Sequence, residues 1–211
     1  FSVTSTLPSV MNGGKDFSEW SRKDDLLYRT MRLPMETVLG RDGVGLADCA
    51  IAESKFEKGE DISRRLLFLI SHMGEIQRNG TPDMEFAVTG LLARSQVTAG
   101  QAEEARRTVE ELKRRFADSG QTRFRANINA LLCRIALYRG ATEEADEWYR
   151  SSAPRSPLNF NVMKRYRYLT QAMVELAQNR PDAALLTLAP MEPYCKTCRR
   201  HIDSIHLHIL Q

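Results

Sequence analysis

The most reactive side chains of the sequence gather near its end, where Cys195 and Cys198 precede three histidines. Two thiolates and two imidazoles can complete a tetrahedral zinc site, with His201, His206 and His208 as the nitrogen donors. His201 follows the second cysteine by only three residues, which is unusual for such a site, and the segment falls where a turn between helices is due. A thioredoxin-like redox site would need a strand before the motif, and no strand is predicted. We therefore predict a turn with incidental thiols and no metal.

The other motifs of the chain do not support catalysis. The sequence has no nucleophile elbow and no His-Glu-x-x-His helix. The run Gly13-Gly14-Lys15 is followed by Asp16 instead of Ser or Thr, so it is not a phosphate loop. We predict that the chain is not an enzyme and has no catalytic residues and no cofactor of its own.

Two arginines are better candidates for binding. Arg94 and Arg134 each precede a glycine by six residues, which gives them one position on the first helices of two successive helix pairs, forty residues apart. Guanidinium groups can hold a carboxylate, a phosphate or a sugar, above all when tyrosines lie nearby. The alternative is that the arginines pair with acids of a neighbouring helix.

Apolar periodicity, capping residues and turn residues define the elements that position these side chains. Residues 1–15 are predicted as an extended lead-in, and a first helix from Asp16 is predicted to be interrupted by Pro34. Thr81 is predicted to cap a helix, while Pro190 and Pro193 shorten or kink another. The later helices are predicted over about 46–57, 61–77, 81–98, 102–118, 122–138, 142–150 and 160–178, then from 181 and from 199.

The predicted helices repeat in pairs. Residues 91–105 return forty residues later as 131–145, each time as Leu-Leu-small-Arg, a glycine and then Glu-Glu-Ala. A third copy has Asn179 at its turn, and a fainter one surrounds Gly59. A repeated unit of about forty residues is typical of a helical solenoid, in which stacked pairs bury one continuous core. We predict an all-α stack of antiparallel helix pairs over 16–211.

The composition is that of an ordinary folded protein. Of its 211 residues, 42% are hydrophobic and 27% charged, which argues against disorder. No segment approaches the ~20 apolar residues of a membrane-spanning helix and no signal peptide is evident, so we predict a cytoplasmic protein without membrane contact. A net charge of +3 is too small to indicate a nucleic-acid binder. The chain opens at Phe1 and its pattern runs to Gln211, so we expect a piece of a longer protein with a truncated last repeat.

The repeat resembles the tetratricopeptide repeat, but it differs in two ways. Its period is nearer forty residues than the usual thirty-four or so, and it lacks the usual glycine in the middle of the first helix. Such longer units resemble the helical-repeat region of LuxR-type, MalT-like bacterial transcription regulators. Similar stretches are residues 4–9, 12–17, 38–41, 43–47 and the run Arg-Tyr-Arg-Tyr-Leu at 165–169. The resemblance covers nearly the whole chain.

This resemblance implies a right-handed superhelix in which Arg94, Asn127, Arg134, Tyr138 and Tyr166 face the concave surface as a ligand or partner groove. It also implies a sensing module that receives a small-molecule inducer or a regulatory protein, with possible self-association. ATP would belong to a separate NTPase domain, and DNA would be bound only through a missing carboxy-terminal helix-turn-helix. The alternative is a protein–protein interaction scaffold with no small-molecule ligand.

Overall fold

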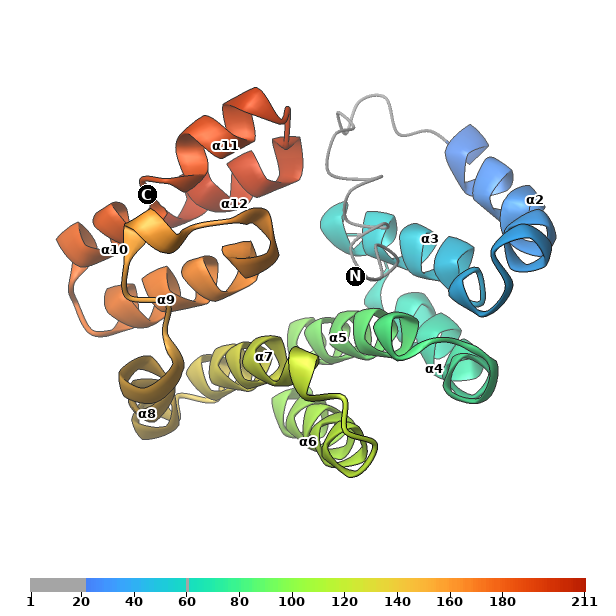
Figure 1. The fold of residues 1–211 in the computed structure, drawn as a ribbon, viewed down its shortest axis with the longest axis horizontal. Helices are drawn as coiled ribbons and strands as arrows, with labels where there is room; N and C mark the ends of the chain where they lie inside the picture. Colours follow the sequence, from blue (N-terminus) through green and yellow to red (C-terminus); the bar gives the residue numbers. More distant parts are fainter. Residues whose placement is uncertain (1–21, 60) are drawn as a thin grey trace. The chain divides into compact units, whose positions relative to one another are not determined.

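The computed structural model describes residues 22–59 and 61–211, whose regular elements are all helices, with no strand among them (Figure 1). The predicted all-α class is therefore confirmed. The extended lead-in at 1–15, the helix start at Asp16 and the Gly13-Gly14-Lys15 run lie outside the described residues. The α-helices are α2 Arg22–Leu39, α3 Leu46–Glu57, α4 Ile62–Asn79, α5 Pro82–Thr98, α6 Ala102–Asp118, α7 Arg125–Tyr138, α8 Thr142–Ser152, α9 Arg165–Ala177, α10 Pro181–Leu188, α11 Met191–Thr197 and α12 His201–Leu210. Short 3-10 helices are η1 Gly40–Asp42, η2 Thr122–Phe124, η3 Pro157–Asn159 and η4 Val162–Lys164.

The chain divides into two compact units, one ending at Thr108 and one beginning at Val109, so that the boundary falls within α6. In unit 1, α2 packs on α3, α3 packs on α4 and α5, and α4 packs on α5. In unit 2, α9 is the central helix and contacts α7, α8, α10 and α12, while α7 packs on α8 and α11 on α12. A single repeat domain over 16–211 stays a prediction.

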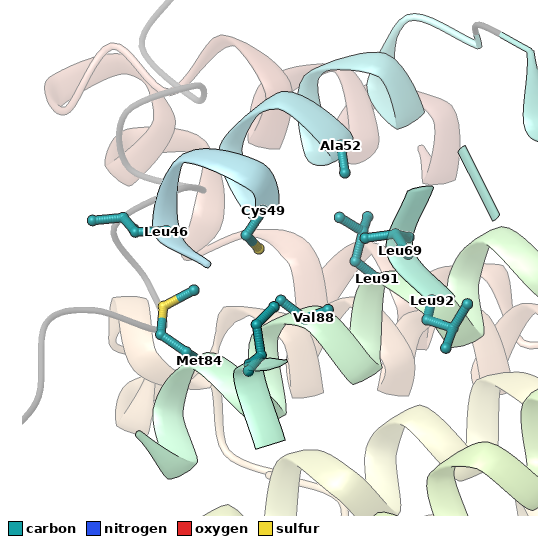
Figure 2. Packing of buried hydrophobic residues seen from close by; sticks show 9 residues of the cluster. Leu46, Cys49, Ala52, Leu69, Met84, Val88, Leu91 and Leu92 are labelled. Carbon is teal, nitrogen blue, oxygen red and sulfur yellow. The ribbon is translucent and has the colours of Figure 1, made fainter. Parts of the chain in front are cut away.

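Each unit has its own apolar core. In unit 1, α3 contributes Leu46, Cys49 and Ala52, three residues apart, so that all three lie on one side of the helix (Figure 2). They meet Leu69 and Ile76 of α4 and four residues of α5, namely Met84, Val88, Leu91 and Leu92. In unit 2, Tyr168, Leu169 and Ala172 of α9 pack with Ala184 and Leu188 of α10, Met191 and Leu207.

Five helix ends close in the same way. Gly100, Gly120, Gly140, Asn179 and Arg199 have φ between 49° and 78°, the left-handed region. In each case the next residue donates its N–H to the carbonyl five residues back: Gln101 to Gln96, Gln121 to Phe116, Ala141 to Ala136, Arg180 to Glu175 and Arg200 to Cys195, at 2.7–3.0 Å. This is the Schellman arrangement, which satisfies the last carbonyls of a helix. The predicted turns at Gly100, Gly120, Gly140 and Asn179 are therefore confirmed.

Small residues occupy one position of the repeat. Ala52, Ala93, Cys133 and Ala172 each lie seven residues before a left-handed residue, and at most 3% of each is exposed. Three alanines five residues after Gly100, Gly140 and Asn179 are equally buried, namely Ala105, Ala145 and Ala184. Cys133 packs in one cluster with Ala145, and Ala172 packs in another with Ala184. Small side chains thus let the two helices of a pair approach closely.

Two substitutions at these turns should change the stability of the chain in opposite directions. Gly100 has φ +78° and open space where a Cβ would lie, so Gly100→Ala should cost about 1 kcal/mol from backbone strain alone. Arg199 is exposed and holds φ 49° without being a glycine, so Arg199→Gly should stabilise the chain by up to about 1 kcal/mol. Urea unfolding midpoints measure both changes. A loss of stability in Arg199→Gly would contradict this account of the turns.

The predicted break at Pro34 is wrong, because α2 continues through it to Leu39. Proline cannot donate to the carbonyl of Thr30, but both residues are exposed, so water can replace the missing hydrogen bond. Arg32 also fixes the middle of the helix, with its Nη2 2.9 Å from Glu75 and its Nε 3.4 Å from Asp48. These contacts with α4 and α3 stabilise a helix that its sequence alone would end.

Three other expectations about helix ends can be compared with the structure. Thr81 lies at the N-cap of α5 but makes no capping hydrogen bond, so the predicted capping hydroxyl is wrong. The helix predicted from Phe160 begins only at Arg165, after η3 and η4. The effect of Pro190 and Pro193 is confirmed, since α10 ends at Leu188 and a separate α11 begins at Met191.

Candidate functional site

Arg94 connects two helices of unit 1. Its Nη2 lies 2.7 Å from the Glu57 carboxylate, and its guanidinium carbon lies 4.2 Å from the centre of the Phe56 ring. Glu57 and Phe56 are on α3, so Arg94 ties α5 to the first helix of the preceding pair. The alternative that this arginine pairs with an acid of a neighbouring helix is what the structure shows.

Arg134 has the same position in its repeat but different partners. Its Nε donates to Thr170 Oγ1 at 2.8 Å and its Nη2 donates to the Tyr166 carbonyl at 3.1 Å. The guanidinium also stacks on the Tyr166 ring, 3.8 Å from its centre. Arg134 therefore ties α7 to α9 through a carbonyl, a hydroxyl and a cation–π contact, which is worth about 0.5–2 kcal/mol in proteins.

Four of the five predicted groove residues lie in unit 2. Three of them lie on one side of α7, because Arg134 follows Asn127 by seven residues and precedes Tyr138 by four. Tyr138 is 64% exposed, Asn127 is half-buried, and Tyr166 contacts Arg134 from α9. We call these four residues the α7 face. Arg94 lies in unit 1, so one groove over all five residues stays a prediction.

One hydroxyl beside the α7 face is buried without a partner. Tyr166 Oη is buried and has no hydrogen-bond partner in the structure. Tyr166 packs against the buried cluster that contains Trp148, and the indole Nε1 of Trp148 is also buried without a partner. Buried donors are normally satisfied by protein, water or ligand. The Tyr166 hydroxyl therefore lies inside the protein, so the groups that the α7 face presents to solvent come mainly from Tyr138.

A serine, a histidine and an aspartate of unit 1 resemble a catalytic triad in composition but not in chemistry. His72 Nδ1 lies 3.0 Å from Ser71 Oγ and 2.8 Å from the Phe68 carbonyl, and its Nε2 lies 4.0 Å from Asp48. A carbonyl oxygen only accepts, so the contact with Phe68 requires the proton on Nδ1. The nitrogen that faces the serine is therefore occupied and cannot act as a base. The prediction that the chain is not an enzyme stays a prediction.

A buried polar network joins three helices of unit 2. Glu175 of α9, only 2% exposed, accepts hydrogen bonds from Tyr149 of α8 at 3.0 Å, from Gln171 at 2.8 Å and from Thr187 of α10 at 2.8 Å. Gln171 also donates to Thr187 at 2.9 Å and accepts from the backbone N–H of Arg155 at 3.0 Å. The sequence interpretation missed this network, although polar residues within the apolar pattern of 168–177 were its signal.

A second buried acid organises the end of the described chain. Asp203 of α12 is 4% exposed, and its two oxygens lie 2.9 Å from Arg200 Nε and 3.3 Å from Arg165 Nε. Arg165 is the first residue of α9, so the pair links α12 and the preceding turn to α9. Removing one partner of a buried ion pair is costly, because it leaves the other charge uncompensated.

The two cysteines of the Cys-x-x-Cys motif have different environments. Cys195 is buried in α11, while Cys198 is exposed at the end of that helix, where Arg199 takes the left-handed conformation. The predicted turn is therefore confirmed only at Cys198 and Arg199, because Cys195 lies within helix α11. In the part of the chain that the structure describes, no three His, Cys, Asp or Glu side chains come together as a metal site. The absence of a metal at Cys195, Cys198 and His201 stays a prediction.

The thiols should differ sharply in reactivity. Burial raises the pKa of Cys133 to about 12 and that of Cys195 to about 11, and it raises the pKa of Cys49 as well. Raised values keep these thiols protonated at mildly alkaline pH, where only a thiolate reacts with a disulfide reagent. Ellman's reagent should therefore label Cys198 quickly and the other three only on unfolding. A second fast thiol in the native chain would contradict this assignment.

The described helices include none that is long and apolar enough to cross a membrane. No protein-family model matches the chain, and searches of curated proteins and of solved structures find no match either.

Proposed function

We propose that this chain is a sensing module built of helical repeats, belonging to a LuxR-type, MalT-like transcription regulator. Its helix pairs would form a right-handed superhelix, and an inducer or a regulatory protein would bind at the α7 face. The bound state would control an attached NTPase and a helix-turn-helix domain in a cytoplasmic regulator that self-associates.

The single observation that supports a repeat module best is the recurrence of one closure geometry and one small-residue position along both units. Left-handed residues at 100, 120, 140, 179 and 199 are twenty residues apart, except for the 39 residues between 140 and 179, which contain two helices. Ala52, Ala93, Cys133 and Ala172 hold the same place before their turns. Repeats of this kind generally expose extended surfaces that bind ligands and proteins.

The chemistry of the α7 face suggests its ligand class. Arg134 supplies a planar cation stacked on the Tyr166 ring, and Tyr138 supplies an exposed ring and hydroxyl. An organic acid, a phosphate ester or a sugar matches these donors. For the ligand to act as a signal it must prefer one arrangement of the helices, because equal affinity for two states shifts nothing.

A second candidate function is a scaffold that docks proteins and has no small-molecule ligand. The observation that favours it is that Arg94 and Arg134 both use their guanidinium groups to tie one first helix to another. In that case their common position in the repeat serves the stability of the stack rather than a groove.

The protein sequence encoded on either side of this chain distinguishes the sensor from the scaffold. The sensor proposal expects a phosphate loop encoded upstream and a helix-turn-helix encoded downstream. In the complete regulator, Tyr138→Ala should abolish the transcriptional response to inducing growth conditions without lowering protein level, since this side chain is 64% exposed. Leu186→Ala, at a 68% exposed position on α10, is the matched control. Flanking sequence without an NTPase or a DNA-binding domain would contradict the sensor and favour the scaffold.

A further inference from the structure

The connection between α8 and α9 differs from the neighbouring turns of unit 2. The α7–α8 and α9–α10 pairs are joined by three residues each, whereas residues 153–164 form a long connection with two short 3-10 helices, η3 and η4. In a protein whose turns are otherwise tight, a long ordered connection is where binding residues tend to concentrate.

This connection is fixed at several points. The Phe160 ring lies edge-on to Tyr168 at 5.2 Å and to Tyr194 at 5.7 Å, which anchors the middle of the connection. Tyr168 Oη donates to the Ser156 carbonyl at 2.6 Å, and the backbone N–H of Arg155 donates to Gln171 at 3.0 Å. The backbone is therefore ordered before any partner arrives, which lowers the entropy cost of binding.

The fixed connection turns apolar side chains towards solvent. Leu158 on η3 is 95% exposed, and Val162 and Met163 on η4 are 38% and 41% exposed. A partner that covered these side chains would gain the free energy of burying apolar surface.

The stretch of sequence that contains this connection is basic. Between Trp148 and Val174 the sequence has five basic residues and no acidic one: Arg150, Arg155, Lys164, Arg165 and Arg167. Arg165 is already paired with Asp203, but Arg150 is exposed and the Lys164 ammonium contacts only a neutral carbonyl, that of Asn159 at 3.2 Å. Apolar side chains bordered by uncompensated positive charge are complementary to an acidic partner.

We propose that residues 153–164 dock an acidic peptide segment of a partner protein. An apolar side chain of that segment packs on Leu158 and Met163, and its carboxylates face Lys164 and Arg150. The two aromatic rings that would stack with bases, Phe160 and Tyr168, pack on each other, so the connection offers no stacking platform for a nucleic acid. It also lacks the long apolar helix face with which proteins lie on a lipid surface.

The test is fluorescence anisotropy of the full chain with a labelled peptide that alternates glutamate with leucine and phenylalanine. Leu158→Ser should weaken binding at least about tenfold, because the leucine side chain would no longer be buried. Lys164→Glu should weaken binding and reduce its dependence on salt. Leu67→Ser is the matched control, since Leu67 is a 70% exposed leucine on α4 and its loss should change nothing.

Several results would overturn the proposal. These are no binding of the acidic peptide, equal binding of the same peptide with glutamine for glutamate, or an unchanged affinity in Leu158→Ser. Tighter binding of a single-stranded RNA or of phosphatidylserine vesicles at this connection would assign the surface to another partner class. The α7 face is not part of this surface, so Tyr138→Ala should leave peptide binding unchanged. Failure of peptide docking at residues 153–164 can therefore be told apart from failure of ligand sensing at the α7 face.

Discussion

Replacing Glu175 by alanine should lower the free energy of unfolding by about 3 kcal/mol or more. The carboxylate is 2% exposed and accepts hydrogen bonds from Tyr149, Gln171 and Thr187. Without it, the Tyr149 hydroxyl loses its acceptor, and buried donors left unsatisfied cost about 1–3 kcal/mol each. The variant also leaves a void among α8, α9 and α10.

Urea denaturation measures this loss, and two variants serve as controls. Glu175→Gln keeps the shape but turns one acceptor into a donor, so it should cost less than the alanine variant. Glu143→Ala removes an exposed glutamate of α8 and should change stability by less than about 0.5 kcal/mol. Equal stability of Glu143→Ala and Glu175→Ala would show that the buried network does not hold unit 2 together.

Enlarging the small residue of the repeat should be similarly damaging. Ala172 of α9 is fully buried and packs against Ala184 of α10, so Ala172→Leu places three extra carbon atoms between closely packed helices. Overpacking of this kind costs about 1–3 kcal/mol, because neighbouring side chains leave their preferred rotamers. We expect a loss of about 2 kcal/mol, read from the melting temperature and the urea midpoint.

The same helix supplies the matched substitution. Ala177 is exposed near the end of α9, so Ala177→Leu adds the same atoms without entering the core and should be nearly neutral. If Ala172→Leu were as stable as Ala177→Leu, the small residues would not mark the closest approach of the helices, and the equivalence of Ala52, Ala93, Cys133 and Ala172 would lose its physical meaning.

The sequence predicted helices and turns well because their causes are local. Gly100 and Gly140 each end a helix through contacts within six residues, and Pro82 and Pro181 each begin one. Pro34 is the instructive exception. There the outcome depends on Arg32 reaching Glu75, which lies 43 residues along the chain and which no local rule identifies.

The contacts of the candidate site depend on distant residues in the same way. Arg94 and Arg134 were predicted as equivalent, yet one reaches back 37 residues to Glu57 and the other reaches forward 36 residues to Thr170. Their equal register in the sequence does not determine which helix each one meets. The Glu175 network likewise assembles from three helices, and only packing brings Tyr149 and Thr187 to the same carboxylate.

The measurement that tests the binding role of the α7 face most directly is a thermal-shift screen of the chain with sugars, organic acids, nucleotides and aromatic metabolites. We expect one class to raise the melting temperature in a saturable way. The rise should disappear in Tyr138→Ala and Arg134→Ala and persist in Leu186→Ala. A rise that survives in both α7-face variants would contradict this account, and a screen in which no compound shifts the melting temperature would favour the protein-docking scaffold.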